Sequence, residues 1–212
     1  MTRIVAGTVG GRTIQVPAKG TRPTSERTRE AIFSRLTHYD AIEDAHVLDL
    51  YAGSGALGLE AASRGAAQVT LVDSARPAVD VARRNVTSLG LGSVVRVVGD
   101  DAARYAAGLA TSAGLASAAE QQSGAVPLSL VFLDPPYDLS DAALADVLAS
   151  LATPGVLAPD AVVVVERSTR SPQPAWPAGP YGLRLLARRD YGETAVYYAE
   201  PNAGDDGTAH VP

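Results

Sequence analysis

Short apolar runs alternate with amphipathic stretches between residues 47 and 166, and this alternation is typical of strands and helices in a parallel α/β sheet. A short apolar run bounded by turn residues is typical of a strand that is buried on both faces. Such runs predict strands at residues 47–51, 69–73, 94–98, 129–133 and 161–166. Two further strands, at 184–188 and 194–199, are expected to close the sheet as an antiparallel pair. We therefore predict an α/β fold with a doubly wound, seven-stranded sheet.

The amino-terminal residues predict a small extension that precedes the sheet. Two short β-like runs, 3–6 and 13–16, flank the turn signal Gly10-Gly11 and predict a β-hairpin. A helix is expected over 24–37, with Thr24 as its N-cap. Its apolar side is expected to hold Ile32, Phe33 and Leu36. We therefore divide the chain into a basic hairpin-and-helix extension at 1–40, a main domain at 41–200 and a disordered tail at 201–212.

The helix that follows the second strand has the clearest signals. Ser74 is expected to cap its amino end and Gly90 to end it. Its apolar residues recur at helical spacing, at Val79, Ala82, Val86 and Leu89. Further along, residues 111–125 are rich in Ala, Ser and Gly and are expected to form a flexible insertion. This insertion lies outside every motif described below.

The composition excludes several classes of protein and of site. The 212 residues are 46% hydrophobic and 19% charged, which is ordinary for a folded protein. No apolar run is long enough to span a bilayer and no leader follows Met1, so we expect a cytoplasmic protein without membrane contact. The absence of cysteine excludes thiol nucleophiles, iron–sulfur clusters and disulfides. The histidines have no metal-binding spacing, so no metal site is expected.

Charge is distributed unevenly along the chain. The net charge is −5, yet residues 1–40 carry seven basic and three acidic side chains, a balance of +4, which leaves −9 for the remainder. A basic arm on an acidic body is typical of a localised polyanion contact, and it predicts binding to nucleic acid. A solvated helix face would give the same pattern of charge.

A glycine-rich loop follows the first strand of the predicted sheet. Glycines at 53, 55 and 58 have the GxGxxG spacing, and Asp73 lies 20 residues past Gly53, at the end of the second strand. Glycines let a ligand approach the backbone, and the following helix terminus favours negative charge. Asp73 is expected to accept hydrogen bonds from ribose hydroxyls. The same pattern is found in NAD-binding proteins, so the loop by itself leaves the nucleotide open.

Asp49, four residues before the first glycine, distinguishes between two candidate ligands of this loop, a dinucleotide such as NAD and S-adenosylmethionine. A carboxylate beside the loop would repel a pyrophosphate but attract the ammonium group of a methionine moiety, which favours S-adenosylmethionine over a dinucleotide. After the third strand, Asp100-Asp101-Ala102 offers a carboxylate that could accept a hydrogen bond from the adenine amino group. Capping of the next helix is an equally good interpretation for one of these two acids.

The motif Asp134-Pro135-Pro136-Tyr137 follows the apolar run 128–133. The prolines have no N–H and a fixed φ, so they form a rigid turn with outward carbonyls. The carboxylate, the carbonyls and the aromatic ring are suited to a planar base that bears an amino group. An ordinary strand-to-loop turn would give the same motif in isolation, but the other elements of the chain favour a binding role.

These motifs, in this order, resemble the class I S-adenosylmethionine-dependent methyltransferases and, more narrowly, the RsmD family of 16S rRNA guanine-N2 methyltransferases. The resemblance covers nearly the whole chain. It depends on five blocks of sequence, which are Arg3 to Gly7, Gly10-Gly11-Arg12, Arg22 to Phe33, Asp49 to Ala61, and Asp134 to Tyr137. It implies a Rossmann-like methyltransferase sheet with a small amino-terminal extension.

The resemblance also implies a reaction and its residues. The reaction is transfer of a methyl group from S-adenosyl-L-methionine to the N2 amine of a guanine in 16S rRNA, on the small ribosomal subunit or an assembly intermediate, by a monomeric enzyme. The implied catalytic residues are Asp134, Pro135, Pro136 and Tyr137. The implied cofactor-binding residues are Thr24, Asp49, Tyr51, Gly53, Ser54, Gly55, Asp73, Ser74, Asp100, Asp101 and Ala102. The implied RNA-binding residues are Arg3, Arg12, Lys19, Arg22 and Arg27.

Other functions fit parts of the sequence less well. An adenine-N6 methyltransferase acting on DNA would use the same Asp-Pro-Pro-Tyr motif, but it needs a target-recognition domain for which the chain has little room. Methylation of protein glutamine uses a related motif with Asn in place of Asp134. An NAD-dependent oxidoreductase would keep the glycine loop, but Asp49 argues against it. A non-catalytic RNA-binding module would explain the basic arm and leave the Asp-Pro-Pro-Tyr motif without a role.

Overall fold

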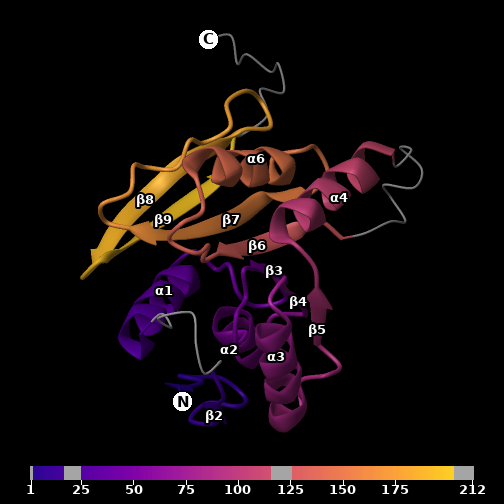
Figure 1. The fold of residues 1–212 in the computed structure, drawn as a ribbon, viewed down its shortest axis with the longest axis vertical. Coiled ribbons are helices and arrows are strands. Elements are labelled where there is room, and N and C mark those ends of the chain that lie inside the picture. The colour runs from indigo at the N-terminus through magenta and orange to yellow at the C-terminus, as the bar shows by residue number, and fades with distance from the viewer. Residues whose placement is uncertain (1, 17–24, 116–125, 203–212) are drawn as a thin grey trace, which may run out of the picture.

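The computed structural model describes residues 2–16, 25–115 and 126–202. Its central sheet has the strand order β5-β4-β3-β6-β7-β9-β8 (Figure 1). The parallel strands are β3 (His46–Leu50), β4 (Gln68–Asp73), β5 (Val95–Gly99), β6 (Leu128–Leu133) and β7 (Leu157–Ser168). The antiparallel strands β8 (Leu183–Tyr191) and β9 (Thr194–Pro201) complete the sheet, with β9 beside β7. The predicted doubly wound, seven-stranded fold is confirmed.

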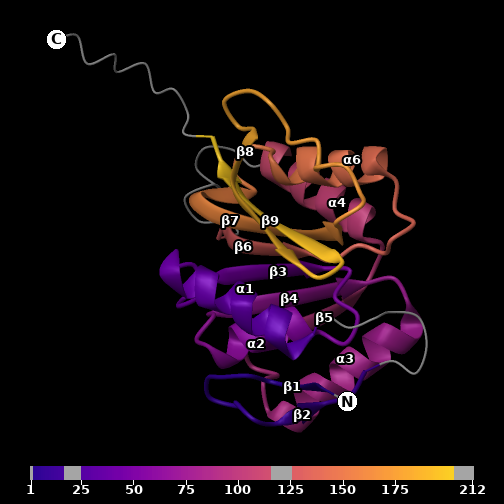
Figure 2. The same cartoon turned by 90° about the vertical axis from the view of Figure 1, so that its left-hand side faces the viewer.

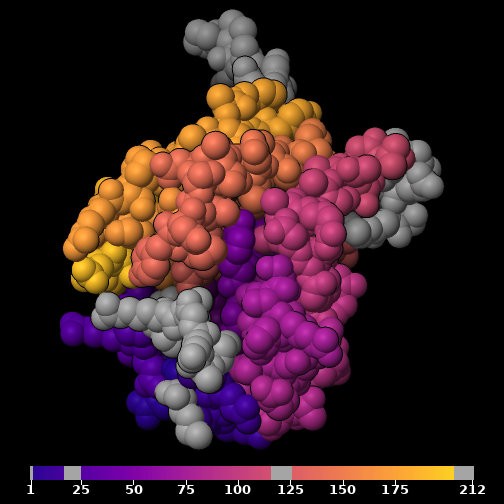
Figure 3. All heavy atoms as spheres, in the orientation of Figure 1, coloured from indigo at the N-terminus to yellow at the C-terminus, as the bar shows by residue number. Residues whose placement is uncertain are grey.

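Helices cover both faces of the sheet (Figures 1 and 2). One face is covered by α1 (Glu26–His38), α2 (Ala56–Ser63) and α3 (Arg76–Leu89), and the other by α4 (Ala102–Leu115) and α6 (Asp141–Leu151). Successive strand residues point to opposite faces, so the sheet feeds two cores. In β6, for example, Phe132 belongs to the α1 side and Leu133 to the α4–α6 side. In Figure 3 the indigo-to-magenta first half of the chain packs directly below the orange-to-yellow second half.

The amino-terminal hairpin is present but shorter than predicted. Its strands are β1 (Thr2–Arg3) and β2 (Thr13–Ile14), which pair in antiparallel register. Residues 5 and 6 do not pair with the second strand of the hairpin, because their amides donate to the side chain of Glu60 instead, at 2.7 and 3.0 Å. A side chain therefore replaces the backbone partner that the sequence pattern predicted.

Two predicted helix caps are wrong. In α1 the N-cap is Ser25, whose hydroxyl accepts a hydrogen bond from Thr28 N at 3.1 Å, and Thr24 lies outside the described residues. In α3 the N-cap is Ala75 and not Ser74, because the side chain of Asp73 accepts from Ala75 N at 2.8 Å. The end of α3 at Gly90, which has φ 74°, is confirmed, and so is the burial of its apolar positions.

The expected insertion at 111–125 is partly wrong. Residues 111–115 continue α4, and the hydroxyls of Thr111 and Ser112 donate to carbonyls of the preceding turn, so these polar side chains are satisfied within the helix. The remainder of the insertion lies outside the described residues, and so does the tail beyond residue 202. Within the described ranges, no helix has the length and apolar character that are needed to cross a bilayer.

Candidate active site

The topology brings the predicted motifs to one edge of the sheet. The strands β3, β4, β5, β6 and β7 are parallel, so their carboxyl ends meet at the same edge. The chain winds outward in opposite directions from the β3–β6 pair, and ligands bind at such a switch point in open α/β sheets. The glycine loop follows β3 and the Asp-Pro-Pro-Tyr turn follows β6. The two motifs therefore begin on adjacent strands.

The glycine loop is built from residues with left-handed backbone. Tyr51 has φ 62°, which is a rare and strained value for a bulky side chain, and Gly53 and Gly55 have φ 57° and 81°. A Cβ built on Gly55 would lie 2.7 Å from Leu71 Cδ1, so the loop packs against β4 there. A Cβ built on Gly53 meets no atom within 4 Å, so open space lies over that part of the loop. A ligand therefore has room to approach the backbone at Gly53.

Asp49 lies beneath this loop. Its side chain is 1% exposed, and its Oδ2 accepts a hydrogen bond from Gly58 N in the first turn of α2 at 2.9 Å. Burial raises the pKa of Asp49 to about 8; the bond from Gly58 opposes this shift, and the charges of Asp134 and Asp73 add to it. The carboxyl group thus fastens the start of α2 from below, whereas the sequence predicted an acid beside the loop.

Asp73 closes the same loop from the neighbouring strand. Its Oδ2 accepts from Gly53 N and its Oδ1 from Ala75 N, both at 2.8 Å. Ser54 is buried, and its carbonyl accepts from Asn85 Nδ2 of α3 at 2.9 Å. Ser74 is exposed beside them. Most predicted cofactor residues are therefore gathered here, with Asp73 as the link between the loop and α3.

Asp100 and Asp101, the acidic pair after β5, bind different partners. Asp101 Oδ1 accepts from Arg104 N at 2.9 Å, which confirms helix capping for this acid. Asp100 accepts from Arg104 Nε at 2.6 Å, and this bond lowers the pKa of Asp100. Ala102 is buried at the start of α4. Burial, and then the charge of Asp101, raise the pKa of Tyr51.

The Asp-Pro-Pro-Tyr turn projects from the end of β6. Asp134 is half-buried, Pro135 is buried, and Tyr137 is 69% exposed. The carbonyl of Pro136 accepts from Leu139 N at 3.0 Å, which makes the turn compact. An aromatic ring that is left largely outside the core is available for stacking.

Arg167, at the end of β7, supports this turn and was missed in the sequence. Its side chain is buried, and its Nη2 donates to the carbonyl of Leu139 at 3.2 Å and to Asp141 Oδ1 at 2.9 Å. The available signal was an arginine two positions past the apolar run 161–165 of a buried strand. A charged side chain in that position needs polar partners, and here they are the segment that follows the turn.

A cavity of about 150 Å³ opens beside the turn. The turn contributes Asp134, Pro135 and Tyr137, and the end of β7 contributes Glu166. The first turn of α1 and the connection between β8 and β9 form its other walls. Glu166 is only 4% exposed and was also missed in the sequence, because an acid at a strand end gives no signal of the direction in which it points. Among the described residues, no group of acids and histidines is arranged to hold a metal ion.

The predicted RNA-binding residues are only partly described. Arg3 is exposed and pairs with Glu26 at 3.1 Å, and Arg27 is exposed on α1. Arg12 donates to the carbonyls of Leu89, at 3.2 Å, and Ser88 at the end of α3. Lys19 and Arg22 lie outside the described residues. These arginines belong to the extension, and none of those described lines the cavity.

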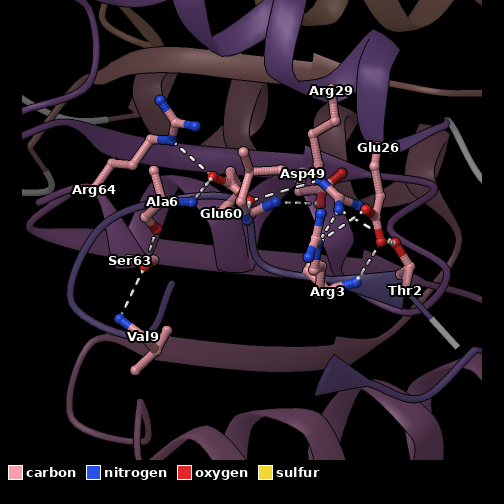
Figure 4. A network of polar contacts seen from close by, with 12 residues as sticks. Thr2, Arg3, Ala6, Val9, Glu26, Arg29, Asp49, Glu60, Ser63 and Arg64 are labelled. Carbon is pink, nitrogen blue, oxygen red and sulfur yellow. Dashed lines mark hydrogen bonds and ion pairs between the residues drawn. The ribbon is translucent and has the colours of Figure 1, made fainter. Parts of the chain in front are cut away.

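One arginine of the basic arm is internal. Arg29 is fully buried, with its Nε 3.6 Å from Glu60 Oε2, and Glu60 also accepts from Arg64 Nε at 2.7 Å (Figure 4). Glu60 lies on α2 and binds the amides of residues 5 and 6, so this network fastens the hairpin to the helix that follows the glycine loop. Arg29 therefore contributes to anchoring the arm and not to its surface charge.

Comparison with known proteins identifies the group to which the chain is similar. The family model described as "Conserved hypothetical protein 95" matches residues 2–200. The "Ribosomal RNA small subunit methyltransferase D" of Escherichia coli K12 is 35% identical over 203 residues, which cover 91% of this chain and 92% of the relative. The protein of that name from Haemophilus influenzae is 30% identical and covers 80% of both chains.

Solved structures agree in sequence and in fold. A "putative methyltransferase yhhF" from Escherichia coli superposes with a TM-score of 0.76 at 30% identity, covering 95% of this chain and 98% of its own. A hypothetical protein of Thermus thermophilus gives a TM-score of 0.72 at 30% identity, covering 94% and 99%. The family model and both solved structures match nearly the full length of this chain. The chain therefore belongs to the RsmD family of methyltransferases.

Proposed function

We propose that this protein transfers a methyl group from S-adenosyl-L-methionine to the N2 amine of a guanine in 16S rRNA, within the small ribosomal subunit or an assembly intermediate. The observation that carries the proposal is the Asp-Pro-Pro-Tyr turn, which stands beside the glycine loop and lines an open cavity. The name shared by the Escherichia coli and Haemophilus relatives supports ribosomal RNA as the substrate.

The residues at the glycine loop fit the cofactor. The open space over Gly53 admits a ligand to the backbone, and Asp73 stands at the loop edge. A carboxylate has about four acceptor positions, and Asp73 uses two for backbone amides, so it can still accept from ribose hydroxyls. Asp100 is the acid of its pair that does not cap α4, so we assign the adenine contact to it. When bound, the cofactor supplies the electrophilic methyl group.

The turn after β6 orients the nucleophile. The N2 amine of guanine is a weak nucleophile because its lone pair is delocalised into the ring. Asp134 and the carbonyl of Pro135 accept the two amine protons, which turns the lone pair out of the ring plane and toward the methyl group. Tyr137 stacks on the base and excludes water. Catalysis is then mainly positioning and fixed electrostatics.

The base must leave its helical stack, or already be exposed in a loop, to enter the cavity. The extension is assigned to the RNA backbone, through Arg3, Arg12, Lys19, Arg22 and Arg27. Such contacts fix the position of the RNA without selecting its sequence. They also make binding depend steeply on salt concentration.

The test is methylation of small subunits that lack the modification. The protein is incubated with these subunits and cofactor labelled in its methyl group, and the labelled nucleotide is then identified and mapped. The expected product is N2-methylguanosine at one position of 16S rRNA. Asp138→Ala is a matched control for Asp134→Ala, since Asp138 is an exposed acid outside the cavity wall. Label on adenine, or no label with any subunit preparation, would contradict the proposal.

A further inference from the structure

Glu166 and Asp134 end neighbouring strands in matching register. Leu133 of β6 pairs with Val165 of β7, and the chain continues from these residues to Asp134 and Glu166 respectively. Side chains alternate along a strand, so Glu166 shares the face of Val164, and Asp134 shares the face of Phe132. Both of these apolar residues belong to the core on the α1 side. The two acids therefore stand side by side on the same face, and both line the cavity.

The edge of guanine that carries the methylated amine has a matching pattern. Guanine displays two adjacent donors there, N1–H and the N2 amine, whereas adenine has an unprotonated acceptor at N1. We propose that Glu166 accepts the hydrogen bond from N1–H while Asp134 holds the N2 amine, so that Glu166 selects guanine. This inference rests on the proposed function, and it adds a residue that determines the specificity of the same site.

The burial of Glu166 makes such selection strong. A carboxylate that is 4% exposed cannot exchange its ligand for bulk water at low cost. If an unprotonated N1 faced Glu166, a lone pair would oppose a buried charge and no hydrogen bond would form. Sites that are built to hydrogen-bond a polar group of the substrate reject analogues lacking that group by large factors, on the order of 10⁴ in favourable cases. Recognition of N1–H therefore also explains how a site with this turn avoids adenine.

The experiment replaces the target guanosine by 2-aminopurine riboside. This base keeps the amine at C2, so it can still be methylated, but its N1 is an acceptor. Small subunits are reconstituted with 16S rRNA ligated to carry either base at the target position. The wild-type protein is expected to lose about 10²-fold or more in kcat/KM on the substituted subunit.

Glu166→Gln provides the decisive comparison. The amide keeps the size of the side chain and gains N–H donors, which can bind the unprotonated N1 of 2-aminopurine. The ratio of kcat/KM on guanosine to that on 2-aminopurine should therefore fall at least about tenfold in the variant. The missing O6 of 2-aminopurine affects both proteins and cancels in this comparison. Glu200→Gln is the matched control, because Glu200 lies on β9, pairs with Arg184 and does not line the cavity.

Three outcomes would overturn the inference. The wild-type protein could methylate both bases at equal rates, which contradicts recognition of N1–H even if the variant fails to fold. Glu166→Gln could fold, as judged by its melting temperature, and keep the wild-type ratio, which assigns Glu166 a structural role while guanine methylation stands. Failure of the wild-type protein to methylate guanosine subunits would remove the proposed function and the inference together.

Discussion

The two halves of the candidate site use their acids differently. In the half that follows β3, β4 and β5, Asp49 and Asp101 accept hydrogen bonds from the first turn of a helix, and Asp73 accepts from the glycine loop. In the half that follows β6 and β7, Asp134 and Glu166 line a cavity. Acids of the first half hold the backbone around the site, so their replacement should change stability and cofactor binding together. Replacement of acids of the second half should change rate or specificity and leave stability largely intact.

The largest effect is expected for Asp134→Ala. The variant loses the acceptor that orients the amine, so turnover should fall by about 10²–10³, which corresponds to roughly 3–4 kcal/mol of activation free energy. Single-turnover methylation at saturating cofactor measures the effect, and the melting temperature should stay close to that of the wild-type protein. A wild-type rate would make the turn a structural element. A large loss of stability would show that Asp134, like the acids after β3, β4 and β5, also holds the fold.

Asp49→Asn tests the first half through pH. The folded-state pKa of Asp49 is about 8, whereas an unfolded aspartate titrates near about 3.9. The folded protein thus binds more protons between these values, and its stability should decrease as pH rises from about 4 to 8, by up to about 1.4 kcal/mol per pH unit. The asparagine variant lacks this titration and keeps an acceptor for Gly58 N. Urea unfolding at several pH values should show a flatter curve for the variant.

The pH comparison has an internal control. Glu26 and Asp100 have lowered pKa values, and because neither is changed by the substitution, both contribute equally to the two proteins. Parallel curves for the wild-type protein and Asp49→Asn would exclude a protonated Asp49 in the folded chain.

Asp73→Ala should change two quantities at once. The side chain accepts from the part-buried Gly53 N, and leaving such a donor without an acceptor costs about 1–3 kcal/mol, whereas the exposed Ala75 N can bind water instead. We expect a loss of about 1–3 kcal/mol in the free energy of unfolding and a similar loss in cofactor binding, measured by urea unfolding and calorimetry. A variant that binds cofactor weakly but keeps full stability would show that Asp73 acts on the ligand alone.

Two variants of Tyr137 distinguish stacking of its ring from hydrogen bonding of its hydroxyl group in the part of the site that follows β6 and β7. Tyr137→Ala should weaken capture of the base by about 1–3 kcal/mol, the usual contribution of a stacked aromatic ring. Tyr137→Phe keeps the ring and should be nearly neutral. Because the ring is 69% exposed, neither change should lower the melting temperature measurably. Equal defects in both variants would assign the contribution to the hydroxyl group.

The smallest effect is expected for Arg27→Ala. Arg27 is exposed on α1, and loss of one phosphate contact should lower the salt dependence of RNA binding by about one in the log–log slope. Arg29→Ala is not a suitable comparison, because it removes a buried partner of Glu60 and destabilises the fold. An unchanged slope for Arg27→Ala would exclude this side chain from the RNA contact.

The sequence predicted the strands well because buried strands appear as apolar runs. The beginning of β7 was missed, since residues 157–160 include Pro159 and Asp160 and pair with β6 beyond a register shift. Helix caps were placed one residue away from their positions. In α3 the reason is local, because Asp73 accepts from Ala75 N two residues further on and a proline in the first turn offers no N–H to a cap.

Only those site residues that belong to a contiguous sequence motif could be predicted from the sequence. Local spacing indicates the candidate residues within contiguous motifs, such as the glycine loop and the turn after β6, and their roles stay predictions. Glu166 and Arg167 belong to no motif, and their importance depends on the pairing of β7 with β6. The sequence gives no sign that Arg29 is internal, because its partner Glu60 lies 31 positions further along the chain. Long-range pairing decides which charged residues are internal.

The anchoring of the hairpin sets the order in which the fold can be completed during synthesis. Val5 needs Glu60 and Arg12 needs Leu89, which are separations of 55 and 77 positions. The hairpin therefore leaves the ribosomal tunnel long before its native contacts exist. Until α3 has emerged, Ile4, which is fully buried in the finished fold, has no complete core to enter. A nascent chain that exposes apolar residues in this way is prone to aggregate and is a substrate for chaperones.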